Sequence, residues 1–434
     1  MKQAKAIFKF KPFSQKQRKV LNWWCENSPV RDYDGIIADG AIRSGKTVSM
    51  SLSFVLWAMT TFNCENFGMC GKTVGSFRRN VLFSLKLMLY SRGYTVIDRR
   101  SENLCIIKKD NVENYFYIFG GKDERSQDLI QGITLAGLLL DEVALMPESF
   151  VNQATGRCSI DGSKIWFNCN PENPSHWFKV NWIDKRDEKR LLYLHFTMDD
   201  NLSLSDRVKE RYRRMYVGVF FERFILGLWT LAQGVIYAMY KDALEEPPEG
   251  AKPERYCLSI DYGTMNAFSA GLWGKYGAVW YRMKEYYYSG RDTGVQKTDE
   301  EYGKALDDLI RPIMEEREAR SGLYIEKMET IIDPSAASFI TLLRKKPWYK
   351  VTPADNAVLD GIRDTASALQ TGKIKISRSC KNWIDEAQGY VWDDKSTEDK
   401  PVKVNDHAMD DTRYFVKTKK IAVHAAPYSN SMYM

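Results

Sequence analysis

The residues with the clearest chemical meaning lie near the N-terminus. Residues 40–47 read Gly-Ala-Ile-Arg-Ser-Gly-Lys-Thr, which matches GxxxxGK[ST] at every fixed position. An apolar stretch precedes this loop and a helical pattern follows it, which is the context that the motif requires. Backbone N–H groups from Gly40 through Arg43, Ser44 and Gly45 would close on the phosphates of a nucleotide. Lys46 would reach the β- and γ-phosphates and Thr47 would hold Mg²⁺, so the pattern predicts an ATP site.

A second acidic element supports this prediction. Leu138-Leu139-Leu140 reads as a buried strand, and Asp141 and Glu142 follow it directly. Asp141 would bind the Mg²⁺ complex, and Glu142 would activate the attacking water. By itself the pair could equally be an acidic loop after a buried strand. Together with the upstream loop, it predicts a nucleotide-hydrolysing core.

Several weaker candidates surround this core. Phe13 and Gln17 precede the loop, where they could contact adenine or form an ordinary surface turn. Arg43 could sense the γ-phosphate. The Asn168–Pro171 stretch could report hydrolysis to the rest of the domain, or be a simple Asn-Pro turn. Four arginines are candidate fingers for a neighbouring subunit, or solvated side chains: Arg78, Arg79, Arg125 and Arg157.

Separated carboxylates form a second possible site. Asp261 ends an apolar stretch, Asp333 ends another, and Asp410 lies on a predicted helix three residues after His407, on the same helix face. Two strand-end carboxylates with helix-borne ligands could hold two Mg²⁺ or Mn²⁺ ions, which activate water and stabilise a leaving phosphodiester oxygen. A strand-end Asp is more often structural, and Asp406 could be only a helix N-cap. Sequence spacing leaves the convergence of the three acids open.

The elements that must position these residues follow an alternating α/β pattern. Residues 244–254 hold three prolines and little apolar content, which is typical of a linker. We therefore predict a P-loop domain over 1–243, a linker over 244–254 and a second α/β domain over 255–434. The strands predicted for the first domain, on a mainly parallel sheet, are 35–39, 66–70, 115–119, 137–140, 164–168 and 190–196. In the second domain we expect strands at 256–260, 267–273, 278–287 and 330–332, and helices at 335–344 and 406–417.

Composition excludes some classes of protein. The eight cysteines form no CxxC pair and only four histidines are present, so a zinc site or a disulfide framework is not expected. No apolar run approaches the ~20 residues that span a bilayer, so no membrane association is expected. The net charge of +7 permits a polyanionic partner without requiring one.

Several segments of the sequence resemble those of a known family. Besides the phosphate loop and the acidic pair, residues 170–177 read Asn-Pro-Glu-Asn-Pro-Ser-His-Trp, and 406–410 read Asp-His-Ala-Met-Asp. With Gln131–Thr134, Ile260–Gly263 and Ile332–Ser335, these segments are similar to those of the large terminase subunits of tailed phages, especially the SPP1 and PBSX-like branch. One departure is Gly40–Arg43, where many relatives have a more glycine-rich loop, which leaves the role of Arg43 open.

The resemblance implies a fold and a function. It implies an ASCE, RecA-like ATPase with Glu142 as catalytic glutamate, followed by an RNase H-like nuclease. Its metal ligands would be Asp261, Asp333 and Asp410, with His407 as an adjacent ligand or proton-transfer group. Such a motor would dock on the portal of the procapsid as a ring, expected to be a pentamer, in the host cytoplasm, and would be absent from the mature virion. A small terminase subunit would select the double-stranded DNA, and the duplex would be gripped by its backbone.

Three alternatives belong to other classes of protein. A helicase or remodelling ATPase would need a second RecA-like half with its own arginine finger, whereas the second half here carries acids at strand ends. A non-enzymatic virion or portal adaptor would tolerate a decayed nucleotide site, yet Lys46, Thr47, Asp141 and Glu142 are all intact. An integrase-like recombinase would have no need of the phosphate loop.

Overall fold

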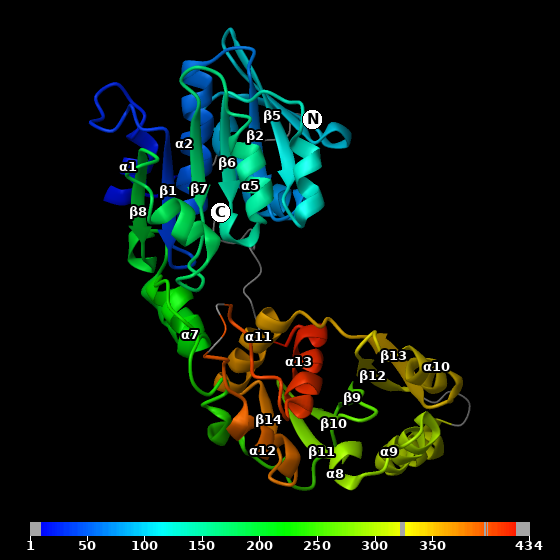
Figure 1. Ribbon diagram of the computed structural model, residues 1–434. Helices are drawn as coiled ribbons and strands as arrows, with labels where there is room; N and C mark the ends of the chain where they lie inside the picture. The colour runs from blue at the N-terminus through cyan, green and yellow to red at the C-terminus, as the bar shows by residue number, and fades with distance from the viewer. Residues whose placement is uncertain (1–9, 322–325, 395, 397, 422–434) are drawn as a thin grey trace. The chain divides into compact units, whose positions relative to one another are not determined.

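The computed structural model describes residues 10–321, 326–394, 396 and 398–421 (Figure 1). The described chain divides into two compact units. One contains the chain up to Arg213 together with Val219–Leu231, and the other contains Arg214–Gly218 and the chain from Ala232 onward. Residues 232–243 thus belong to the second unit, and the domain limits proposed from sequence stay a prediction.

The first unit is built on an eight-stranded sheet with the order β3-β4-β5-β2-β6-β7-β1-β8. Strands β2, β5, β6, β7, β1 and β8 pair in parallel, whereas β3–β4 and β4–β5 pair antiparallel. The strand β7 lies between the strand that precedes the phosphate loop and the strand that ends in Asp141, as expected for an ASCE core. The strands are β1 Gly35–Gly40, β2 Asn66–Gly71, β3 Thr95–Arg99, β4 Leu104–Lys109, β5 Val112–Gly120, β6 Gly137–Asp141, β7 Lys164–Asn168 and β8 Leu191–Phe196.

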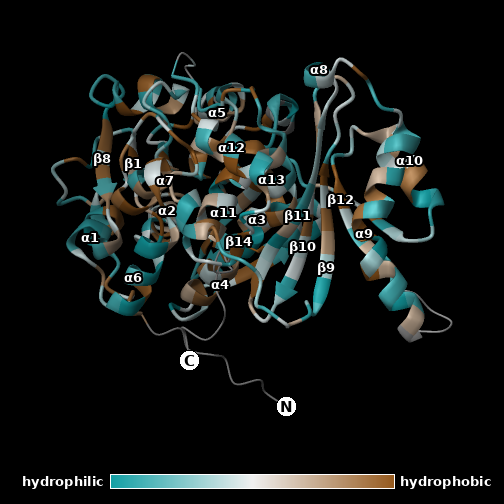
Figure 2. Cartoon of the chain, turned by 90° about the horizontal axis from the view of Figure 1, so that it is seen from below, coloured by the Kyte–Doolittle hydropathy of each residue, from teal (hydrophilic) through white to brown (hydrophobic). Residues whose placement is uncertain are grey.

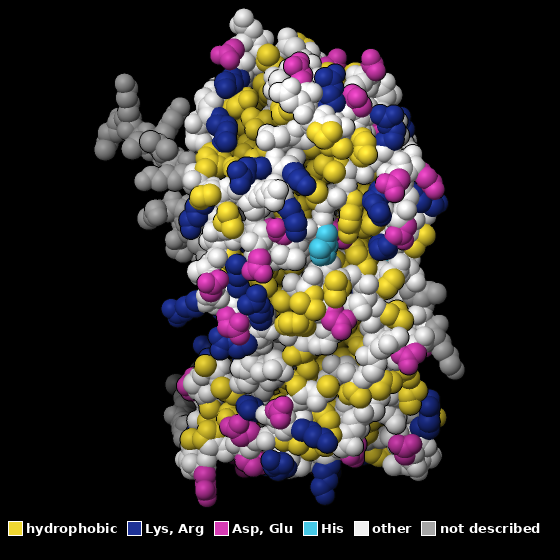
Figure 3. Space-filling model, turned by 90° about the vertical axis from the view of Figure 1, so that its left-hand side faces the viewer, with side chains coloured by type: hydrophobic (Ala, Val, Ile, Leu, Met, Phe, Trp, Pro, Cys, Tyr) yellow, Lys and Arg dark blue, Asp and Glu magenta, His cyan; other side chains and the backbone are white. Residues whose placement is uncertain are grey.

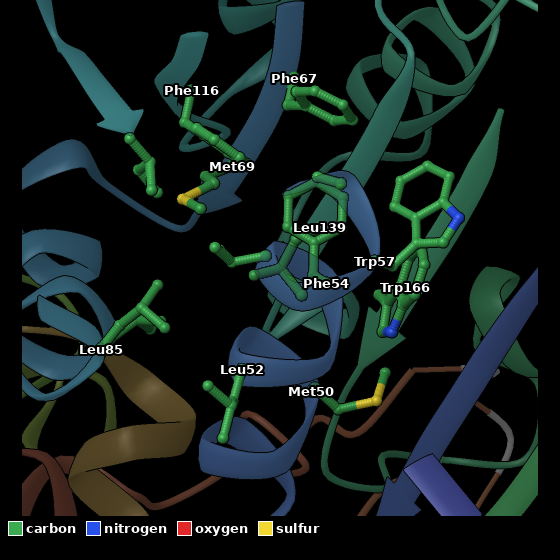
Figure 4. Close-up of a cluster of buried hydrophobic side chains, with 14 of the residues drawn as sticks. Met50, Leu52, Phe54, Trp57, Phe67, Met69, Leu85, Phe116, Leu139 and Trp166 are labelled. Atoms are coloured by element: carbon green, nitrogen blue, oxygen red, sulfur yellow. The ribbon is translucent and has the colours of Figure 1, made fainter. Parts of the chain in front are cut away.

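Both faces of this sheet are buried, because successive side chains of a strand point to opposite sides. Leu139 packs in the core that includes helix α2 (Lys46–Thr61), and Leu138 packs in the core that includes helix α5 (Glu148–Thr155). Figure 4 shows Trp57 of α2 beside Trp166 of β7, with ring centroids 4.8 Å apart. Apolar packing on both faces therefore holds the carboxyl end of β1, where the phosphate loop begins.

The remaining helices of the first unit are short. The strongly charged helix α6 is largely teal in Figure 2, as its Arg, Lys and Glu content requires. Its last residues and the start of α7 fall in the second unit. These helices are α1 Gln15–Asn22, α3 Val74–Phe77, α4 Phe83–Tyr90, α6 Asp206–Met215 and α7 Gly218–Phe221.

The second unit contains a six-stranded sheet with the order β13-β12-β9-β10-β11-β14. Strands β9, β10 and β11 pair antiparallel, while β12 joins β9 in parallel and β13 joins β12 in parallel. This is the RNase H-like arrangement predicted above. The strands are β9 Arg255–Asp261, β10 Ala267–Tyr276, β11 Val279–Ser289, β12 Met328–Ile332, β13 Tyr349–Pro353 and β14 Ile374–Ile376.

Helices cover both faces of this sheet. Helix α13 packs on β9 and β10, where Trp273 stacks on Phe415 with centroids 4.1 Å apart. Residues of α9 and α10 belong to an apolar cluster that also includes residues of β9 and β12. The helices are α8 Gly290–Thr293, α9 Asp299–Ser321, α10 Ala337–Lys345, α11 Val358–Gln370, α12 Lys381–Gly389 and α13 His407–Lys419.

The predicted α/β class is confirmed, and every predicted strand is present within a few residues of its expected ends. Four strands were missed, namely β3, β4, β13 and β14. The first of these, Thr95–Arg99, is largely exposed, so it lacks the apolar run that marks a buried strand. Both sheets are mixed, because each contains antiparallel as well as parallel pairs, although parallel pairs predominate in the first.

No helix among the described residues is long and apolar enough to cross a membrane. The face shown in Figure 3 carries interspersed basic, acidic and hydrophobic side chains, and no single charge covers it. This distribution agrees with the mild net charge of +7.

Candidate functional sites

The phosphate loop has the backbone shape that its sequence predicts. Gly40 and Gly45 have φ of +119° and +84°. A side chain at Gly40 would place its Cβ 2.0 Å from the carbonyl oxygen of Phe196, so only glycine fits. Arg43 also adopts a positive φ of 58°, and its carbonyl accepts a 2.7 Å hydrogen bond from Asn201. The backbone of the loop is thus set in place by neighbouring segments.

Lys46 lies folded inside this loop. Its Nζ donates to the carbonyl oxygens of Gly40 and Ala41 at 3.0 and 2.7 Å, to Ser44 Oγ at 3.2 Å and to Asn170 Oδ1 at 3.2 Å. Burial lowers the pKa of Lys46 to about 8. The ammonium group is therefore held by oxygen atoms of the loop and of Asn170, and its contact with a β- or γ-phosphate stays a prediction.

Thr47 and Asp141 meet although they are 94 residues apart. Thr47 Oγ1 donates to Asp141 Oδ1 at 3.1 Å, and Asn168 donates its amide to both side chains. Burial and the neighbouring Glu142 raise the pKa of Asp141 to about 7. A hydroxyl and a carboxylate side by side at the carboxyl ends of β6 and β7 provide the oxygen ligands that Mg²⁺ prefers.

Glu142 lies directly beyond this pair. It adopts a left-handed conformation with φ of 59° and begins a short 3₁₀ helix over Val143–Leu145. A non-glycine residue in this region carries backbone strain, which is common at functional sites. The turn places Glu142 at the same end of the sheet as the phosphate loop.

The weaker candidates, Gln17 and the arginines, differ in their surroundings. Gln17 caps α1 with Ser14, and its amide also reaches the carbonyl of Gly45 at 3.5 Å, so it contacts the phosphate loop. Arg78 donates to Asp98 at 2.6 Å within the first unit. Arg79 and Arg125 are exposed. The arginine finger for a neighbouring subunit stays a prediction.

In the second unit, Asp261 and His407 form a pair. Asp261 Oδ2 lies 2.8 Å from His407 Nδ1, between the end of β9 and the start of α13. Burial raises the pKa of Asp261 to about 6, although the hydrogen bond with His407 opposes this. Although burial lowers it, the pKa of His407 is raised on balance by Asp261 and by the charges of Glu386 and Asp406.

Asp410 lies one turn further along α13. Its Oδ1 accepts from Arg413 Nε at 3.1 Å and from Nη2 at 2.8 Å, and its Oδ2 accepts from Lys403 Nζ at 3.2 Å. Lys403 also lies 2.9 Å from Asp406, whose side chain makes no capping bond to the helix. Although burial would lower it, the pKa of Lys403 is raised by these two carboxylates.

Asp333, at the end of β12, is held by hydrogen bonds. It accepts from Ser335 N at 2.7 Å, from Tyr414 Oη at 3.0 Å and from Asn356 at 3.4 Å. Although burial raises it, these bonds lower the pKa of Asp333 on balance.

The three acids share one neighbouring side chain, Tyr414. Besides burial, the charges of Asp261, Asp410 and Asp333 all raise the pKa of Tyr414. Among the described residues, no three His, Cys, Asp or Glu side chains lie close enough together to hold a metal ion. The carboxylates suit a hard cation by chemistry, but each is paired with a hydroxyl or basic group in this arrangement. Their role as ligands stays a prediction.

Sequence reasoning missed the residues that fix α13. Glu386 is buried and accepts from the backbone N–H of Ala408 at 2.6 Å and of Met409 at 3.3 Å, at the positive end of the helix. Asp411 is fully buried and pairs with Arg282, which is also fully buried. These acidic and basic residues lie on separate elements and form no motif, so the sequence did not indicate that they interact. The helix that carries His407 and Asp410 is therefore anchored at its N-terminus and along its buried face.

Together, these features define a P-loop nucleotide-hydrolysing core joined to an RNase H-like unit with three acids around one tyrosine. Comparison with known proteins agrees. The sequence profile of the family described as "Terminase large subunit, T4likevirus-type, N-terminal" matches residues 37–241. No curated protein matches the chain.

Solved structures give a closer likeness. The large terminase from a thermophilic bacteriophage is 58% identical over 94% of this chain and 99% of its own, with a TM-score of 0.86. The same phage protein in complex with ADP gives 58% identity over the same coverage, with a TM-score of 0.83. In complex with ATP-gamma-S it gives 56% identity over 93% of this chain and 98% of its own, with a TM-score of 0.82.

The chain belongs to the large terminase family of tailed bacteriophages. It is therefore a viral DNA-packaging ATPase that is also an endonuclease, and it binds nucleotide and DNA as part of the packaging machinery. The helicase and adaptor alternatives do not account for this family membership. The SPP1/PBSX-like branch inferred from the sequence stays a prediction.

Proposed function

We propose that ATP binds as its Mg²⁺ complex at the phosphate loop, with the roles predicted from the sequence. Gly40, Arg43, Ser44 and Gly45 line the phosphates, Lys46 contacts them, and Gln17 closes the adenine side. Thr47 and Asp141 hold the ion, and Glu142 orients the attacking water. The observation that supports this best is the 3.1 Å contact between Thr47 Oγ1 and Asp141 Oδ1.

We further propose that Asp261, Asp333 and Asp410 hold two Mg²⁺ or Mn²⁺ ions for DNA cleavage, with His407 assisting Asp261. Bound ions of this kind activate water and stabilise the leaving oxygen of a phosphodiester. The 2.8 Å contact of Asp261 with His407 fixes the orientation of both side chains. The three carboxylates around Tyr414 supply the oxygen donors that such ions prefer.

The proposed partners are those that the resemblance to the large terminases implies. We propose that the enzyme docks on the portal of the procapsid as a homopentameric ring in the host cytoplasm, and that a small terminase subunit selects the DNA. We retain 1–243 as the ATPase domain, 244–254 as the linker and 255–434 as the nuclease domain. The Asn168–Pro171 stretch is the proposed coupling segment, since Asn168 contacts Thr47 and Asn170 contacts Lys46.

Cleavage of plasmid DNA in Mg²⁺ or Mn²⁺ tests the nuclease assignment. Asp261→Ala should abolish cleavage, because a proposed ligand is removed, while ATP hydrolysis continues. Asp333→Ala should behave in the same way. Asp308→Ala is the matched control, since Asp308 pairs with Arg311 on the surface of α9, at 2.7 Å.

Unchanged cleavage by Asp261→Ala would remove Asp261 from the metal site. Loss of both cleavage and ATP hydrolysis would indicate misfolding or a shared site, and circular dichroism of the purified variant distinguishes these two explanations.

A further inference from the structure

Only one oxygen of Asp410 can be released to a metal ion. Its Oδ1 accepts two bonds from Arg413, at 3.1 and 2.8 Å. Arg413 is 2% exposed, and its third nitrogen donates to the carbonyl of Asn356 at 2.8 Å. Parting Arg413 from Asp410 would leave a buried cation unpaired, at a high energetic cost. A divalent ion at Asp410 must therefore bind Oδ2.

Lys403 lies on that same oxygen. Its Nζ is 3.2 Å from Asp410 Oδ2, and its side chain is 57% exposed. Lys403 lies outside any helix or strand, between Pro401 and the start of α13. Unlike Arg413, it can leave without an unpaired charge being buried.

A second carboxylate lies ready for the displaced ammonium group. Asp406 Oδ2 is 2.9 Å from Lys403 Nζ, and the Asp406 side chain caps no backbone N–H of α13. Lys403 can thus give up Asp410 and keep one ion pair. Asp406 can therefore serve as the partner of Lys403, rather than as the helix N-cap that the sequence suggested.

We propose that Lys403 and the divalent ion compete for Oδ2 of Asp410, and that Lys403 thereby sets the metal affinity of the nuclease site. A cation on this oxygen both occupies its lone pairs and repels an incoming positive charge. When the ion binds, Lys403 moves to Asp406 alone. The inference rests on the proposed function, because it takes Asp410 as a metal ligand.

Binding of Mn²⁺ to the full-length protein without nucleotide, followed by the electron paramagnetic resonance signal of free Mn²⁺, tests this competition. Lys403→Met keeps the length of the side chain and removes its charge. We expect it to tighten Mn²⁺ binding roughly fivefold or more, because a neighbouring unit charge is lost. Lys400→Met is the matched control, since Lys400 lies in the same segment and its ammonium group pairs with Glu398, at 2.8 Å.

The outcomes separate this inference from the proposed function. Asp410→Asn identifies the binding that depends on Asp410. If that binding exists in the wild type and Lys403→Met leaves it unchanged or weakens it, the competition is wrong while the metal site stands. If neither the wild type nor Lys403→Met binds Mn²⁺ through Asp410, both proposals fail.

A double-mutant cycle tests the exchange between carboxylates. Asp406→Asn should weaken Mn²⁺ binding in the wild type, because Lys403 then has only Asp410 as partner. The effect should shrink in the Lys403→Met background. An equal effect in both backgrounds would show that Asp406 acts without Lys403, and would overturn the exchange.

Discussion

At the scale of single residues, the nucleotide site depends on polar side chains that constrain one another. Asn168 donates to both Thr47 and Asp141, so the hydroxyl and the carboxylate are oriented before any ion binds. Such preorganisation lowers the cost of assembling a catalytic site. Glu142 lies one residue beyond Asp141 in a left-handed conformation, and we expect it to act on a water rather than on the ion.

Glu142→Gln tests this division of roles. Losing a positioned general base typically costs about 100-fold or more in rate, so ATP turnover should fall by that amount. Nucleotide binding, measured by fluorescence titration with a labelled ATP analogue, should be retained. Glu148→Gln is the control, because Glu148 accepts from Asn181 on a neighbouring segment. Undiminished turnover by Glu142→Gln would assign the water to another residue.

At the scale of elements, the position of α13 determines where His407 and Asp410, the residues that we propose for the nuclease site, are held. Asp411 accepts from Arg282 of β11, and from Ser259 and Ser269 at 2.9 and 2.5 Å. The helix therefore presents Asp411 to the sheet, while Asp410, one residue earlier, points about a quarter-turn away. Because both residues lie on α13, a small rotation of this helix would displace His407 and Asp410 at the same time.

Arg282→Met should loosen this helix. Removing one partner of a buried ion pair costs about 3–5 kcal/mol, because the remaining charge is left buried without compensation. Hydrogen exchange of the 407–419 peptide, read by mass spectrometry, should show a matching loss of protection. Lys252→Met breaks an exposed pair with Glu316, and should change stability by less than about 1 kcal/mol. Unchanged protection in Arg282→Met would mean that apolar packing alone holds α13.

At the scale of the whole molecule, two activities are carried by separate α/β sheets of one chain. The net charge is +7, and on the face shown in Figure 3 the basic side chains are interspersed with acidic ones. We expect the duplex to be held through contacts with its phosphates. Binding should therefore depend on salt, because each phosphate contact releases counterions.

Fluorescence anisotropy with a labelled duplex measures this dependence. For two phosphate contacts, affinity should fall roughly tenfold between 50 and 200 mM salt, and more for each further contact. Duplexes of unrelated sequence should show similar slopes, since backbone contacts carry no sequence information. A salt-independent affinity would contradict binding through the backbone.

The sequence by itself determined the local chemistry. The loop at 40–47 requires its glycines, and apolar strands that end in Asp141, Asp261 and Asp333 bring those acids to strand ends. Parallel strands carry their carboxyl ends to one edge, so the meeting of Thr47 and Asp141 was predictable although 94 residues separate them. The fold class followed from the same apolar pattern.

Only the tertiary structure decided which groups neutralise these acids. Lys403, Arg413 and Tyr414 reach Asp410 and Asp333 through the path of a loop and the rotation of a helix, which no local pattern specifies. The same holds for Arg282 and Asp411, whose pairing depends on the packing of α13 against the sheet. Charged side chains look alike in a sequence whether they are solvated or buried, because burial is a property of the packed chain.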